Sequence, residues 1–300
     1  MALRPDVDLA RHKKAVFGHT RRFDDCHGEI MARPFLTRSP TPGELTLLKK
    51  YLGSYRDGTG NNREIDGTSR ADSRQIERCF AELLHGRTTE SKAFYDFVVE
   101  SNEAGGIAVR GASIKSKEIK KLLELKSPAA MQTMRAHLEV SNSSAGDWRL
   151  CEERGLTTDD FKEHLKPDEF GSAILARQNL MRETSEAAYL KAAGGNRFFV
   201  PADGVFISVL YSPPVNGERS WFVASFPVIL PAPETWSFGG SCIEGRDAQG
   251  ELLYEWYALS GSQLKYYPKL ADRLHGTDLF QLPCPAVETL RAKSSRLFGD

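Results

Sequence analysis

Residues 93–115, AFYDFVVESNEAGGIAVRGASIK, decide how the rest of the chain is interpreted. Residues 93–99 and 107–115 are two runs rich in β-branched and aromatic side chains, and the segment between them contains two consecutive glycines. Such runs joined by a glycine-containing turn are typical of a β-hairpin. Because side chains two apart share a face of a strand, a hairpin in the right register would bring Asp96 and Lys115 onto one patch.

An acid placed among phenylalanine, tyrosine and valine, as Asp96 is, costs free energy to bury unless it binds a cation or a hydrogen-bond donor. Hydrolysis of a phosphodiester uses a divalent metal to hold the phosphate and to lower the pKa of a water molecule. A fixed cation such as Lys115 would stabilise the negative charge that develops. Asp96 and Lys115 therefore predict the centre of a metal-dependent site that cleaves DNA.

One carboxylate of this predicted site is missing, because Ser113 stands two residues before Lys115, where a second acid would complete it. Serine is a poor ligand for magnesium, so another element must supply the acid. Glu139 lies in a third strand-like run at residues 136–141, and Glu77 lies at the rim of the apolar stripe of a predicted helix at 72–85. Both glutamates remain candidates.

Four short segments, taken in order, resemble the catalytic core of restriction endonucleases of the PD-(D/E)xK nuclease superfamily. These segments are residues 74–77 (RQIE), 90–96 (ESKAFYD), 111–115 (GASIK) and 138–143 (LEVSNS). The resemblance covers roughly residues 65–150, and the chain departs from the family pattern at Tyr95, where proline is usual, and at Ser113. It implies that Asp96 holds Mg²⁺, that Lys115 positions the attacking water, and that Glu139 or Glu77 completes the metal site.

The order of the predicted elements indicates an α+β fold. Helices are expected at 41–52, 72–85 and 117–125 and through most of 144–193, whereas the runs after residue 195 read as strands between Gly/Pro turns. We therefore expect a mixed central sheet flanked by helices, which is the restriction-endonuclease-like core, with a β-rich C-terminal third. Residues 1–195 would form the catalytic core, and residues 196–300 would complete it or contact DNA.

Several side chains of the types that reach phosphates and base edges lie near these segments or in the C-terminal third. The candidates for contact with DNA are Arg63, Arg70, Arg74, Lys117, Asn142, Gln263 and Lys265. Each also fits an ordinary polar loop, a solvated helix or a strand with one wet face.

Composition places few limits on the function. The chain has 300 residues, of which 40 % are hydrophobic, and its 40 basic and 40 acidic residues balance. No run approaches the ~18 apolar residues of a membrane span, the first residues lack the apolar core of a signal peptide, and five cysteines are widely scattered. These features predict a cytoplasmic protein with reduced thiols and no membrane partner.

The leading hypothesis is a Mg²⁺-dependent type II restriction endonuclease that cuts double-stranded DNA at a specific sequence and acts as a homodimer, because cutting both strands of a symmetric target requires two sites. Two alternatives remain open. One is a DNA- or protein-binding protein in which Ser113 records a lost active site, and the other is a repair or RNA-processing nuclease built on the same core.

Overall fold

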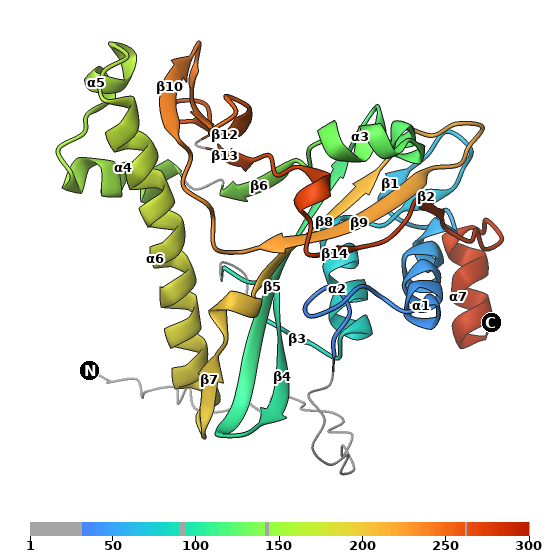
Figure 1. Cartoon of the computed structure of the whole chain (residues 1–300). Coiled ribbons are helices and arrows are strands. Elements are labelled where there is room, and N and C mark those ends of the chain that lie inside the picture. Colours follow the sequence, from blue (N-terminus) through green and yellow to red (C-terminus); the bar gives the residue numbers. More distant parts are fainter. Residues whose placement is uncertain (1–31, 90–93, 142–143, 262, 300) are drawn as a thin grey trace, which may run out of the picture.

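The computed structural model describes residues 32–89, 94–141, 144–261 and 263–299, which form two large β-sheets and the helices around them (Figure 1). The helices are α1 (Pro42–Gly53), α2 (Ser73–Leu83), α3 (Pro128–Thr133), α4 (Ser144–Glu153), α5 (Thr158–Lys162), α6 (Pro167–Ala193) and α7 (Leu290–Phe298). The strands are β1 (Asn62–Arg63), β2 (Ser69–Arg70), β3 (Arg87–Thr88), β4 (Phe97–Glu103), β5 (Gly106–Glu118), β6 (Leu138–Ser141), β7 (Arg197–Phe199), β8 (Val205–Tyr211), β9 (Ser220–Pro227), β10 (Thr235–Gly239), β11 (Cys242–Arg246), β12 (Leu252–Tyr257), β13 (Gln263–Tyr266), β14 (His275–Gly276) and β15 (Phe280–Gln281). The predicted α+β class is confirmed.

The central sheet is mixed, as predicted. Its main path runs β14-β9-β8-β5-β4-β3, with β7 and β15 attached to β5 and β9. β5 pairs antiparallel with β4 on one side and parallel with β7 and β8 on the other. Of the strands that follow residue 195, β7, β8, β9, β14 and β15 therefore lie in the same sheet as the β4–β5 hairpin.

The β4–β5 hairpin forms with a tighter turn than expected. The predicted strand at 93–99 begins later in the structure, at Phe97, and β4 continues to Glu103, which pairs with Gly106. Gly105 and Gly106 have φ values of 104° and 138°, which residues with a Cβ rarely adopt. These two glycines permit the close turn, so the strands extend into the segment that was expected to be a loop.

The expected helix at 117–125 is wrong. β5 continues through Lys117 to Glu118, where it pairs with Tyr211 of β8, and only a short 3₁₀ turn, Leu122–Lys126, follows. The start of the run joined β5 because a distant segment, β8, supplies hydrogen-bonding partners for Lys117 and Glu118, and the rest forms a turn and the 3₁₀ helix.

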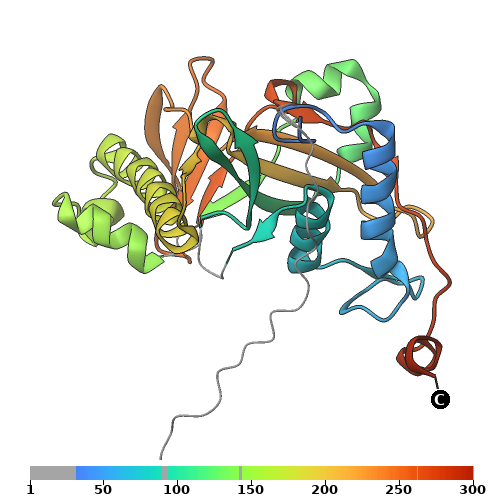
Figure 2. The same cartoon turned by 90° about the horizontal axis from the view of Figure 1, so that it is seen from below.

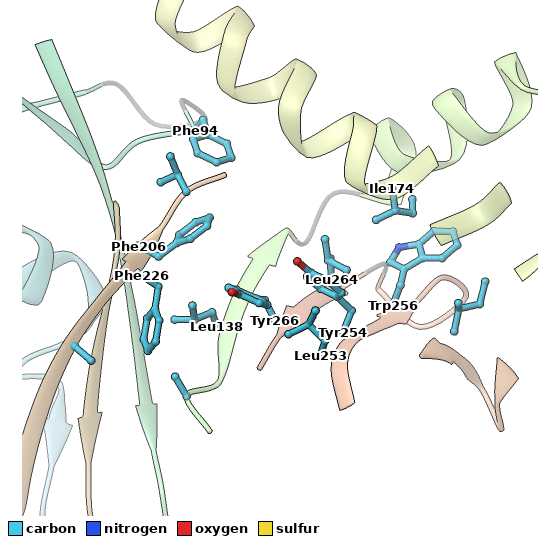
Figure 3. Packing of buried hydrophobic residues seen from close by; sticks show 14 of the residues in the cluster. Phe94, Leu138, Ile174, Phe206, Phe226, Leu253, Tyr254, Trp256, Leu264 and Tyr266 are labelled. Atoms are coloured by element: carbon cyan, nitrogen blue, oxygen red, sulfur yellow. The ribbon is translucent and has the colours of Figure 1, made fainter. Parts of the chain in front are cut away.

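The second sheet has five antiparallel strands in the order β10-β11-β12-β13-β6. One of its faces packs toward the central sheet and α6, and the larger hydrophobic core lies between them. Figure 3 shows Phe206 and Phe226 of the central sheet facing Leu138, with Trp256 beyond, next to Ile174 of α6. The strands after residue 195 thus contribute to both sides of this core.

A second core lies on the opposite face of the central sheet, under α1 and α2. Each of these helices begins with a capping box, from Thr41 to Glu44 in α1 and from Asp72 to Gln75 in α2. Ile76 and Phe80 of α2 are fully buried, so their face of the helix is fixed against the sheet. α2 is thereby held beside β4 and β5, with Glu77 at the border of its buried face.

The C-terminal helix α7 lies at the periphery of the molecule (Figures 1 and 2), and none of its residues is buried. Among the residues that the structure describes, no helix combines the length and the apolar character needed to cross a lipid bilayer.

Candidate active site

Asp96 lies immediately before β4 and is anchored at both ends of its backbone. Its N–H donates to the carbonyl of Ala112 at 2.9 Å, and its carbonyl accepts from the N–H of Thr89 at 3.1 Å. Its side chain accepts two further hydrogen bonds at Oδ2, from the backbone N–H of Ile114 at 2.5 Å and from Ser113 Oγ at 3.2 Å. The position and orientation of the carboxylate are therefore fixed by β5.

Ser113 does not supply a second carboxylate, but its side chain hydrogen-bonds to the first one, that of Asp96. It is almost completely buried, and its hydroxyl donates to Asp96. A carboxylate at this position would place a second negative charge against Asp96 instead of a hydrogen-bond donor. Ser113 thus orients the Asp96 side chain, and the second carboxylate of a metal site has to come from another element.

Lys115 is half-buried and follows Ser113 on the same face of β5. β4 pairs with β5 only as far as Ala112, whereas β5 continues to Glu118 alongside β8. Asp96 and Lys115 therefore lie at the part of β5 where the pairing with β4 ends and the pairing with β8 continues. The register that the sequence left open does bring the acid and the base to one patch.

Glu77 lies on α2, which packs on the opposite face of the central sheet from Lys115. The side chain is half-buried, and burial and then the negative charge of Asp96 raise its pKa to about 7, while Lys115 and Arg74 oppose this rise. The charges of Asp96 and Lys115 thus both act on the Glu77 carboxyl. Two ionised carboxylates near each other repel. A divalent cation bound between them would neutralise this repulsion and so stabilise the ionised pair.

Glu139, on β6 of the second sheet, contacts a residue further along β5. Its Oε1 is 3.4 Å from Nζ of Lys117, and in the second sheet it pairs in register with Lys265. Lys117 follows Lys115 on the same face of β5, about 6–7 Å further along the strand. Of the two glutamates that the sequence left as candidates, Glu77 is the one that interacts with Asp96 and Lys115, whereas Glu139 contacts the next lysine.

The residues predicted to contact DNA fall into two groups. Arg74 is exposed in the first turn of α2, one turn before Glu77, and the exposed Arg63 lies on the β1–β2 hairpin that precedes this helix. Arg70, on the same hairpin, is 3.5 Å from the carboxylate of Glu64 and stacks over the ring of Tyr211 at 4.4 Å, so it is held within the protein.

The second group lies on the second sheet. Nζ of Lys265 is 4.0 Å from the ring centre of Tyr257, and the half-buried Gln263 begins the same strand, β13. Asn142 lies outside the described residues. The structure thus places Asp96 beside Ser113, two residues before Lys115, and it joins Lys117 to Glu139 by an ion pair. Glu77 and Arg74 lie on α2 at the other face of the sheet, and Arg63 and Gln263 lie on other elements.

Sequence analysis missed how the segment before Asp96 is held by α6. The hydroxyl of Tyr95 donates to Oε1 of Glu186 at 2.7 Å, and the guanidinium of Arg182 is 3.0 Å from the same atom. The three side chains are buried. A Cβ on Gly111 would lie 2.3 Å from the ring of Tyr95, so this glycine makes room for the tyrosine. Because α6 lies some ninety residues further along the chain, no local pattern indicates the contact.

A second set of possible metal ligands was also missed. The ligand atoms of Cys242, Glu244 and Glu255 lie within 4.8 Å of one another on the polar face of the second sheet. Each of them has a protein partner, since Cys242 donates to the carbonyl of Gly239 at 3.2 Å, Glu244 pairs with Arg246 at 2.5 Å, and Glu255 accepts from Tyr267. Alternation of side chains along two antiparallel strands produces this cluster, but the pairing of the strands could not be read from the sequence.

Comparison with known proteins adds no relative. No family model, no curated protein and no solved structure matches the chain. The assignment of a function therefore rests on the residues and their geometry.

Proposed function

We propose that this protein is a Mg²⁺-dependent endodeoxyribonuclease, and specifically a type II restriction endonuclease that hydrolyses double-stranded DNA at a defined sequence. The observation that carries the proposal is that Asp96 is held beside Ser113, two residues before Lys115, where the β4–β5 pairing ends, with the carboxyl of Glu77 within electrostatic reach from α2. Two carboxylates and a lysine around one point are the set of groups that metal-assisted hydrolysis of a phosphodiester requires.

These residues fit a magnesium ion by their chemistry. Mg²⁺ prefers carboxylate oxygens and is usually held in proteins by one or two of them. Asp96 and Glu77 would hold the ion, and when bound it would neutralise the scissile phosphate and acidify a water molecule. The raised pKa of Glu77 supports this reading, because the repulsion that contributes to it is relieved by a cation.

The remaining residues would not be ligands of the metal ion and would have other roles. Lys115 offers a fixed positive charge beside the carboxylates, where it would orient the attacking water and stabilise the charge that develops on the phosphate. Ser113 and the Ile114 N–H hold the Asp96 carboxylate in place. Arg74, exposed one turn from Glu77, would contact a neighbouring phosphate and help to seat the duplex.

The proposal extends to the assembly and its compartment. Cleavage of both strands of a symmetric target requires two copies of the site, so we propose a homodimer. The scattered cysteines favour a reducing compartment, and we place the protein in the cytoplasm.

Digestion of a mixed-sequence plasmid in magnesium tests the proposal. We expect discrete fragments from the native chain and at least a ~100-fold lower rate from Lys115→Ala, because removal of one fixed group that stabilises developing charge typically costs that much. Lys120→Ala, at an exposed lysine nearby, is the matched control and should cut like the native chain.

Each other outcome supports a different function. Gel-shift of DNA without cutting in magnesium would support a non-catalytic binding protein, and fragments without fixed ends, or cleavage of RNA, would support a repair or processing nuclease. Equal cutting by the native chain and Lys115→Ala would remove Lys115 from the mechanism.

A further inference from the structure

An open cavity of about 560 Å³ lies between the C-terminal half of α6 and the strands β3, β4 and β7. Cavities that bind small organic molecules usually have volumes of about 300–1,000 Å³. The candidate active site lies elsewhere, because Asp96, Glu77 and Lys115 do not line the cavity. It is therefore a separate concave site, and its lining indicates what it could bind.

One wall of the cavity is aromatic. The rings of Tyr95 and Phe199 stack with their centres 5.8 Å apart and their planes 12° apart, and Tyr189 meets Phe199 edge-on at 5.7 Å. Both tyrosine hydroxyls donate to carboxylates that do not line the cavity, at 2.7 Å to Glu186 and at 2.9 Å to Glu100. The rings are thereby held in place. Tyr95 is buried and supports Phe199, so the half-buried Tyr189 and Phe199 supply the apolar surface that faces the cavity.

The α6 side of the cavity has small residues, and they leave the aromatic wall accessible. Ala188 and Ala192 lie one turn apart on the helix and are exposed. A larger side chain at either position would project into the space that a ligand needs. The size of these residues therefore matters more than their polarity.

The polar part of the lining is cationic and donates hydrogen bonds. Arg87 lies exposed on the edge strand β3, and Thr88, Thr184 and Ser185 add hydroxyl groups. No carboxylate is among the described residues that line the cavity. Glu100, whose carboxyl feels the charge of Arg87, is bound by Arg197 at 2.7 Å. Arg87 itself forms no ion pair with any acid among the residues that the structure describes, so its charge can serve a ligand.

We propose that this cavity binds a small organic anion with a planar aromatic body. The aromatic part would lie against Tyr189 and Phe199, and the anionic group would lie toward Arg87 and the hydroxyls. Stacking on aromatic rings and a charge-assisted hydrogen bond are the two interactions that this lining offers together. The proposal does not depend on cleavage of DNA.

Fluorescence titration of the full chain with 1-anilinonaphthalene-8-sulfonate, a planar aromatic anion, tests the proposal. We expect saturable binding to one site, weakened roughly tenfold to a hundredfold in Arg87→Gln, as loss of a hydrogen bond to a charged group would produce. N-phenyl-1-naphthylamine, which has the same rings without the sulfonate, should bind the native chain more weakly and should not respond to Arg87→Gln. Arg78→Gln, at an exposed arginine of α2 outside the cavity, is the charge control.

A pair of neighbouring alanines tests the location of the site. Ala188→Phe fills the cavity and should abolish binding. Ala187→Phe, at the preceding position of the helix and outside the lining, should leave binding unchanged. If Ala188→Phe fails to fold, Ala192→Leu replaces it. Equal binding by the cavity-filling variant and the native chain, or equal binding of the charged and the neutral probe, would overturn the proposal. Failure of plasmid cleavage would leave it unaffected.

Discussion

Glu77 has an environment that distinguishes it from the other acids of the candidate site. Burial and the charge of Asp96 raise its pKa to about 7, so near neutral pH part of the population carries a proton on this carboxyl. A bound divalent cation would favour the ionised form, and the metal would then be held by two charged ligands. Glu77 is for this reason the residue with which to test the metal site.

We expect Glu77→Gln to lose at least ~100-fold in cleavage rate at low magnesium, since even partners that only orient a metal ligand are worth about 10–100-fold. Glu139→Gln should lose much less, because its carboxylate contacts Lys117 and not Asp96. Rates measured over a range of magnesium concentrations check both variants. A larger loss of cleavage rate in Glu139→Gln than in Glu77→Gln would mean that Glu139, and not Glu77, completes the metal site.

At the scale of residues, the sequence was informative where chemistry depends on alternation along one strand. The faces of Asp96 and Lys115 follow from that alternation, and their meeting needed only the register of one hairpin. The choice between Glu77 and Glu139 could not be made, because it depends on how a helix and a second sheet pack around β5. The role of Ser113 was hidden for the same reason, since a donor is recognised only beside its acceptor.

Among the elements, α1 was predicted closely because its signals are local. The sequence TPGE at 41–44 contains a capping residue, a proline and a reciprocal glutamate, and the structure has all three at the start of the helix. The expected helix at 117–125 failed because the same polar residues can form a strand once β8 is available as a partner. Elements determined by distant partners cannot be derived from their own residues alone.

The start of α1 should make stability depend on pH. Arg38 and the hydrogen bonds of Thr41 lower the pKa of Glu44 from its ordinary value of 4.5 to about 2. Because the folded-state pKa is lowered, Glu44 stabilises the protein above pH 4.5, and this contribution is lost as the pH falls from 4.5 toward 2. Urea unfolding of the native chain and Glu44→Gln should differ by about 1 kcal/mol at pH 7 and converge near pH 2. A difference that stays constant between these pH values would contradict this account.

At the scale of the whole molecule, the β-rich last third contributes strands to both large sheets, the central one included. β8 pairs with β5 over its full length, and residues from β8, β9 and β12 lie in the main core with residues from before residue 195 (Figure 3). The sequence indicated a change of character near that residue, but a change in the type of element does not by itself separate two folding units. Parallel pairing between β5 and β8 joins segments that are far apart in the chain, and no local pattern announces it.

A chain that ends at residue 195 should therefore fail to fold. It lacks β8, so the edge of β5 is unpaired, and it lacks Phe206, Phe222 and Trp256 from the main core. An unpaired apolar edge promotes aggregation, so we expect a chain without a cooperative unfolding transition, recovered mainly in aggregates.

A chain that ends at residue 286 is the matched control, because α7 contributes no buried residue and its removal should cost only about 1–2 kcal/mol through loss of the contact between Lys293 and Asp57. Thermal unfolding followed by circular dichroism distinguishes the two. A cooperative transition in the chain that ends at residue 195 would mean that residues 1–195 form a core of their own. The central sheet would then be assembled from two folding units.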